Sequence, residues 1–95
     1  MIKDDERERL IKQMQAANQK RLEAAYEVGK GLLLLKEHES REDFIEILLK
    51  HFGLTEIDGE AICKPMRQSA EPEAAERISE IMLNATLRRL EGTDA

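Results

Sequence analysis

The sequence predicts an all-α fold, and two observations carry this prediction. Apolar residues recur at the three- and four-residue spacing of a helix, and no stretch alternates with the period of two that a half-buried strand requires. The composition points the same way, because 37% of the residues are charged and few are aromatic, while Ala, Leu, Glu, Lys and Arg are abundant. At 95 residues, the chain is predicted to form a single domain, residues 1–95.

The first predicted helix is long and carries a coiled-coil-like seam. It begins near Asp4 or Asp5, because acidic side chains are favourable at a helix N-terminus, and nothing stops it before residues 38–40. Two rows of residues recur every seven positions: Ile11, Asn18, Ala25 and Leu32, and Met14, Arg21, Val28 and Leu35. Such a helix spans ~50 Å, whereas a compact domain of this size has a diameter of ~32 Å. The domain is therefore too small to cover it.

This uncovered seam predicts a homodimer built as a helical bundle. Dimerisation is a common source of stability for chains of this size. The dimer seam is expected at Ile11, Met14, Leu22 and Ala25. In the alternative, the chain is a monomer whose C-terminal helix folds back along the first helix and covers the seam as an antiparallel bundle.

Two short helices are predicted to follow as a hairpin. Ser40 is an N-cap with Asp43 three positions later, a capping pattern, and Gly53 ends this helix as the first residue beyond it. Thr55 and Asp58 repeat the capping pattern at the start of the next helix.

Prolines and glycines indicate where other helices begin, end or make close contacts. Pro65 is expected to keep the third helix short, because proline removes a backbone hydrogen bond in a helix interior. Pro72 opens a C-terminal helix, and Gly92 is expected to close it. Gly29 and Gly31 lie inside the long helix, where they mark either a kink or a close helix contact. Close contact is favoured, because Ala25 and Gly29 lie one turn apart and leave a bare strip of backbone.

Charge is unevenly distributed and predicts a basic protein partner. Residues 37–60 carry eight acidic against two basic side chains, a net charge of −6, within a chain of net charge −5. The expected contact surface consists of Glu39, Glu42, Asp43, Glu46, Glu56 and Asp58. Leu33 and Leu34 are possible apolar anchors. The other interpretation of this acidic block is a solvated face that keeps a small protein soluble.

DNA binding is the alternative function. Residues 41–70 read as helix, glycine turn and helix, which is the order of a helix-turn-helix motif. Glu56 and Asp58 count against it, because they would meet phosphates at the start of the second helix. Nucleic-acid binding would need one face formed by Lys12, Lys20, Arg21, Lys64, Arg67, Arg88 and Arg89.

No enzyme, cofactor or metal site is predicted. His51 and Cys63 lack the spacing of a metal site, and no phosphate loop or nucleophile motif occurs. A single cysteine fits a reducing cytoplasm, the highly charged start does not read as a signal peptide, and no apolar run is long enough for a membrane span. A soluble cytoplasmic protein is therefore expected.

Residues 24–55, AAYEVGKGLLLLKEHESREDFIEILLKHFGLT, resemble a family of small helical proteins of unknown function from bacteria, phages and plasmids. Its members share A-x-x-I-G-x-x-L-x-x-x-K-E, then a short loop and an aromatic-bearing helix that ends in F-G-[IL]-[ST]. The matching residues are Ala25, Val28, Gly29, Leu32, Lys36, Glu37, Phe44, Phe52, Gly53, Leu54 and Thr55. The resemblance implies a helical fold and a mobile-element origin. With the acidic block, it predicts a regulator or inhibitor that occludes a basic surface of a host protein.

Overall fold

The computed structural model describes residues 1–93, which form helices and turns and contain no strand. In chain order the elements are α1 (Asp4–His38), α2 (Arg41–Ile47), the π-helical turn η1 (Leu48–Phe52), α3 (Glu56–Gln68) and α4 (Glu71–Thr93). The predicted all-α fold is confirmed. So is the long first helix, which begins at Asp4 and runs for 35 residues through both internal glycines.

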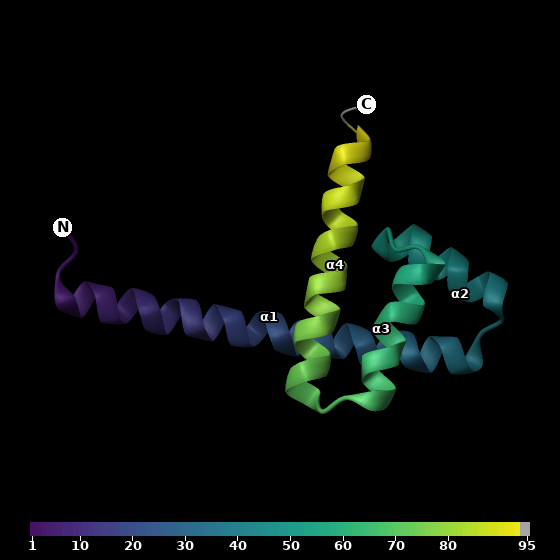
Figure 1. Cartoon of the computed structure of the whole chain (residues 1–95), viewed down its shortest axis with the longest axis horizontal. Coiled ribbons are helices and arrows are strands. Elements are labelled where there is room, and N and C mark those ends of the chain that lie inside the picture. Colours follow the sequence, from purple (N-terminus) through teal and green to yellow (C-terminus); the bar gives the residue numbers. More distant parts are fainter. Residues whose placement is uncertain (94–95) are drawn as a thin grey trace.

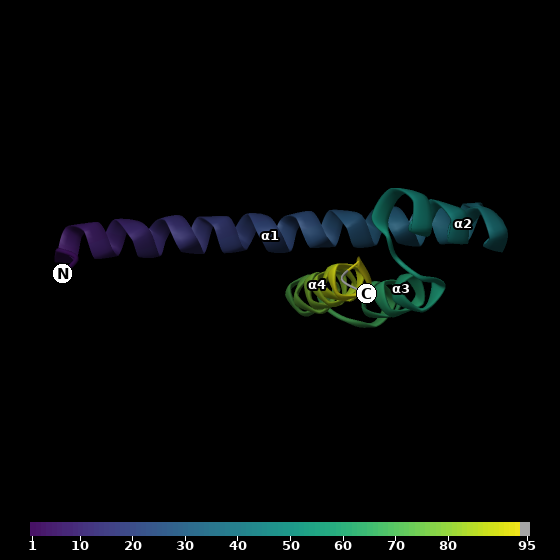
Figure 2. The ribbon, with the colours of Figure 1, turned by 90° about the horizontal axis from the view of Figure 1, so that it is seen from above.

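The helices are arranged in two layers. α1 and α2 lie in one layer, and α3 and α4 lie side by side in the other (Figure 2). α4 crosses α1 and does not run along it (Figure 1), so the antiparallel bundle considered as the monomeric alternative is wrong. α3 packs extensively against α4 after the short turn at residues 69–70, and the main helical hairpin therefore lies one helix later than predicted.

The N-terminal half of α1 extends beyond the rest of the molecule (Figure 1). We call residues 4–20 the arm, and every one of them is exposed to solvent. The longest dimension of the molecule is 55 Å, about the length predicted for the long helix alone. The expectation that the domain is too small to cover this helix is confirmed.

Local capping sets most helix ends as predicted. The Ser40 hydroxyl accepts a hydrogen bond from the Asp43 N–H at 3.1 Å and starts α2. Gly53 adopts a left-handed conformation, with φ of 64°, and ends η1. Thr55 and Asp58 form a complete capping box at the start of α3.

Two predicted helix ends are wrong. α3 continues through Pro65 to Gln68: the proline removes one backbone hydrogen bond, and its burial in the packed helix offsets that loss. The Ser69 N–H still donates to the Pro65 carbonyl at 2.9 Å. α4 runs past Gly92 to Thr93, and Gly92 does not have the positive φ of a C-terminal glycine cap.

The core lies where the two layers meet, at the C-terminal half of α1. It is formed by Ala25, Leu32, Phe44, Leu48, Leu54, Ile62, Cys63, Ile78, Ile81 and Ala85. The four consecutive leucines of α1 point in different directions around this core. Leu32 is buried, Leu33 and Leu35 are half-buried and pack against the core, and Leu34 is 57% exposed.

Gly29 lies at a close contact between layers, as predicted. A Cβ atom at this position would lie 2.6 Å from Ile78 Cδ1 and 2.7 Å from Met66 Sδ, which is below van der Waals contact. Gly31 is exposed, and a Cβ there would have no neighbour within 4 Å. Gly29 is therefore needed for packing, whereas Gly31 only weakens the helix.

We expect leucine to have opposite effects at these two glycines. Gly29→Leu should lower the free energy of unfolding by about 1–3 kcal/mol, because it overpacks the contact with Ile78 and Met66. Gly31→Leu should raise it by about 0.5–1 kcal/mol, because leucine is the better helix former and the site is open. Urea unfolding followed by circular dichroism measures both. Equal effects at the two positions would contradict the close contact.

Candidate protein-interaction surfaces

Four of the predicted partner-binding carboxylates lie together on an exposed surface. Glu42, Asp43 and Glu46 occupy the solvent-facing side of α2, and Glu39 lies just before it. Glu39, Asp43 and Glu46 line one wall of a shallow groove of about 260 Å³ that is completed by Ile47, Lys50 and His51. We call Glu39, Glu42, Asp43 and Glu46 the acidic surface. Among residues 1–93, no lysine or arginine forms an ion pair with any of them.

Glu56 lies apart from this surface and is already paired. Its carboxylate accepts two hydrogen bonds from the Arg41 guanidinium, from Nε at 2.8 Å and from Nη2 at 3.0 Å. This bidentate bond lowers the pKa of Glu56 and raises that of Arg41. The pair joins the start of α2 to the start of α3, so Glu56 contributes to the fold and offers no unpaired charge.

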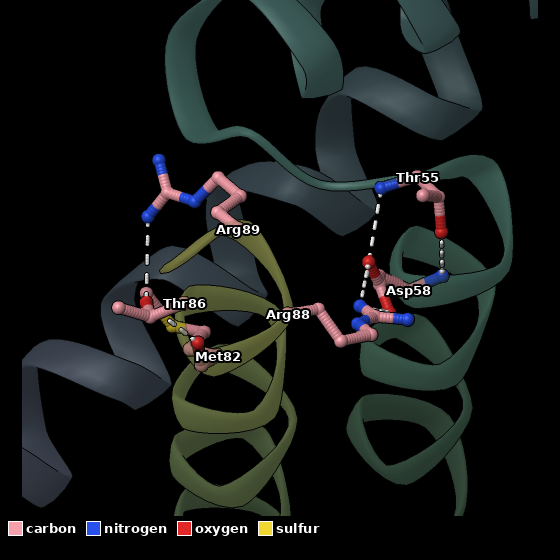
Figure 3. Close-up of polar contacts among 6 residues, drawn as sticks. All are labelled: Thr55, Asp58, Met82, Thr86, Arg88 and Arg89. Carbon is pink, nitrogen blue, oxygen red and sulfur yellow. Dashed lines mark hydrogen bonds and ion pairs between the residues drawn. The ribbon is translucent and has the colours of Figure 1, made fainter. Parts of the chain in front are cut away.

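Asp58 was predicted to contact a partner, and this prediction is wrong. Its side chain is buried, with 6% exposure. Figure 3 shows the carboxylate between the Thr55 backbone N–H, which donates at 3.0 Å, and Arg88 of α4, whose Nη2 lies 2.7 Å and 2.6 Å from the two oxygens. Burial raises the pKa of Asp58, but the hydrogen bonds from Arg88 and Thr55 outweigh burial and lower it. Asp58 therefore caps α3 and ties it to α4.

The predicted dimer seam divides into a covered part and an exposed part. Ala25 is buried and lies beside Ser79 and Met82 of α4, so the chain itself covers this position and its assignment to a dimer seam is wrong. Leu22 is half-buried next to the start of α4. Ile11 and Met14 lie on the arm with exposures of 40% and 63%. They face the same side of α1 as Ala25, because they lie 14 and 11 residues before it.

The basic residues required for DNA binding do not share one element, and two are engaged in the fold. Arg88 binds Asp58, and Arg21 donates to Ser79 and lies 3.6 Å from a Glu76 oxygen of α4. The remaining ones are distributed over the arm, α3 and α4: Lys12, Lys20, Lys64, Arg67 and Arg89. Of the two predicted apolar anchors, only Leu34 is exposed and available to a partner, because Leu33 packs against the core.

Sequence reasoning missed an exposed apolar row on α4. Leu83, Leu87 and Leu90 lie four and three residues apart, so they share one side of the helix, and all three are exposed. The spacing was visible in the sequence. It was not recognised because residues 75–85 of the same helix carry the core-facing repeat.

Within residues 1–93, no three His, Cys, Asp or Glu side chains come together in a way that could hold a metal ion. No helix in this part of the chain is long and apolar enough to cross a membrane. Cys63 is buried in the core, and burial raises the pKa of its thiol. No protein-family model, curated protein or solved structure matches the chain.

The Asp58 site predicts a specific pH dependence. The folded-state pKa of Asp58 lies below its ordinary value of 3.8, so the ionised carboxylate stabilises the fold above pH 3.8, and this contribution is lost as the pH falls through the folded-state pKa. Asp58→Asn keeps an acceptor for Thr55 but has no charge for Arg88. We therefore expect this variant to be less stable than the wild type at neutral pH and the difference to shrink below pH 3.8. Glu42→Gln, at an exposed carboxylate with no ion pair, is the control and should change stability little at any pH.

Proposed function

We propose that the protein is a non-enzymatic regulator that binds another protein through its acidic surface and occludes a basic surface of that partner. One observation carries the proposal: Glu39, Glu42, Asp43 and Glu46 lie together on one exposed surface with no cation of the described chain paired to them. By contrast, Glu56 and Glu60 each have a basic partner within the chain, Arg41 and Lys36.

The electrostatic argument favours a protein partner with a basic surface. Like charges that are held together repel one another, and a basic partner relieves this repulsion while its approach is accelerated by long-range attraction. Duplex DNA would be repelled by the same surface. The shallow groove beside these carboxylates offers Ile47 as apolar contact area. The resemblance of residues 24–55 to small phage and plasmid proteins is the basis for proposing a host protein as the target and inhibition as the outcome.

We also propose that the protein acts as a homodimer. The arm is helical over residues 4–20 although every residue in it is exposed and only Gln19 lies beside another described element, the start of α4. Helices in proteins take most of their stability from an apolar face packed against a neighbour. Ile11 and Met14 provide the exposed part of such a face, and a second copy of the chain is the proposed neighbour.

Charge reversal on the acidic surface tests the proposed partner binding. The immobilised protein is used to capture proteins from a bacterial lysate, and a captured protein is then purified and titrated by calorimetry at low and moderate salt. We expect a partner with a basic surface whose affinity falls roughly tenfold or more with Glu42→Lys/Glu46→Lys and falls with salt.

Glu71→Lys/Glu91→Lys is the matched control for this experiment. It also reverses two exposed charges that form no ion pair with a described residue, one of them in the first turn of a helix, but both lie on α4. Loss of binding in both variants would mean that net charge alone is responsible. Salt-sensitive retention of duplex DNA by the wild-type protein, with no protein partner, would contradict the proposal and favour the DNA-binding alternative.

Light scattering tests the proposed dimer. The wild-type protein should have about twice the chain mass of 10.9 kDa at tens of micromolar, and Ile11→Glu/Met14→Glu should have the mass of one chain, because two carboxylates would be buried in the seam. Leu49→Glu/Ile57→Glu replaces two exposed apolar residues outside the arm and should leave the dimer intact. A wild-type mass of one chain would refute the dimer.

A further inference from the structure

On one side of α1, the side chains of the arm form a row that is compatible with the same row running in the opposite direction. Continuing the two seven-residue rows toward the N-terminus places six residues on one side of α1: Asp4, Arg7, Ile11, Met14, Asn18 and Arg21. All six are exposed, and the helix is continuous through them. Arg21 and Asn18 are joined by hydrogen bonds at 2.8 and 3.1 Å, which confirms that these two lie on one side.

We propose that two copies of the chain pair through their arms in an antiparallel two-fold arrangement with a single register. In this register Ile11 of each copy faces Met14 of the other, Arg7 faces Asn18, and Asp4 faces Arg21. The inference rests on the proposed homodimer and adds its geometry.

No facing pair in this register brings like charges together. Ile11 and Met14 form the apolar centre, and the two-fold axis repeats the pair. Arg7 of one arm faces the neutral Asn18 of the other, whose side-chain carbonyl already accepts two hydrogen bonds from Arg21 of its own chain, so this layer brings no like charges together. Asp4 of one arm faces Arg21 of the other, which has N–H donors left after its hydrogen bonds to Asn18 and Ser79 and lies 3.6 Å from a Glu76 oxygen of its own chain. The exposed Leu10 flanks the centre and lies near Ala17 of the second copy, which extends the apolar contact.

Charge complementarity excludes the parallel arrangement. In a parallel pair each seam residue faces its own copy, so Asp4 would face Asp4, Arg7 would face Arg7 and Arg21 would face Arg21. Three of the six layers would then bring like charges together, which costs affinity instead of adding to it. The antiparallel register contains no like-charge layer.

A groove lies beside Arg21, where the second arm would begin. Arg21 lies directly after the arm, where α1 begins to contact α4. A groove of about 680 Å³ lies between the two helices here and is lined by Arg21, Glu76, Ser79 and Leu83, among others. The antiparallel register brings the start of the second copy's α1 to this groove. Because α1 begins at Asp4, the helix of the second copy would start opposite Arg21 in this register, and its Lys3 would lie toward the glutamates of the groove.

A change of charge in one layer tests the register. Asn18→Glu keeps an acceptor for Arg21 of its own chain and places a carboxylate opposite Arg7 of the other copy. We expect the dissociation constant of the dimer to fall roughly tenfold, because the layer occurs twice. Arg7→Glu/Asn18→Glu then places glutamate opposite glutamate and should raise the dissociation constant above the wild-type value. Analytical ultracentrifugation measures both. A parallel pair would bring the new glutamates of the two copies together, so a weaker dimer with Asn18→Glu alone would overturn the proposal.

Disulfide exchange supplies an independent measurement. Ile11→Cys and Met14→Cys are prepared separately, and under mild oxidation their mixture should form far more covalent dimer than either variant alone, since a disulfide requires Cα atoms within ~7 Å. Cys63 is buried and does not compete. Efficient linkage within each single variant would show the parallel arrangement and refute the register alone. A wild-type monomer would refute the proposed dimer and the register together.

Discussion

The close crossing of α4 over α1 at Gly29 determines the rest of the structure. Without a side chain at Gly29, Ile78 and Met66 approach the α1 backbone, and Ala25 one turn earlier is buried in the same contact. Because α4 crosses α1 at this point, it covers only the middle of that helix (Figure 1). The core is thereby confined to the C-terminal half of α1, and the arm is left to solvent.

The second constraint is the Asp58 carboxylate, which serves two elements at once. It completes the capping box of α3 and holds Arg88 of α4, so the beginning of one helix of the hairpin is fixed to the distal half of the other. The ion pair between Arg41 and Glu56 ties α2 to the same end of α3. Asp58 and Glu56 are therefore already paired within the chain. The proposed binding surface is correspondingly smaller than the acidic segment, residues 37–60.

Features that depend on nearby residues could be predicted from the sequence. The caps at Ser40 and Thr55, the end at Gly53 and the start at Asp4 involve neighbours within a few positions, and all agree with the structure. The close contact at Gly29 was also predictable, because the small residues Ala25 and Gly29 lie one turn apart and let another helix approach the backbone of α1.

Features that depend on distant residues could not be predicted in this way. The pairing of Asp58 with Arg88 joins positions 30 residues apart, and nothing in the local pattern distinguishes Asp58 from the exposed Asp43. The crossing direction of α4 decides whether Ala25 is covered by its own chain, yet the repeat of the seam is the same in either case. Pro65 shows a third limit, because the local rule that proline ends a helix was overridden by the burial of its ring.

The uncovered arm also links folding to concentration. Its backbone hydrogen bonds are protected by no other described part of the chain, so in a lone copy they open easily and exchange their amide hydrogens quickly. In the proposed dimer each arm orders the other, and the free energy of helix formation becomes part of the free energy of association. Dilution would then melt residues 4–20 while the core around Leu32 and Ile78 stays folded. If the proposed dimer forms, the protein would respond to its own abundance, because its first helix would be complete over its full length only where enough copies are present to pair.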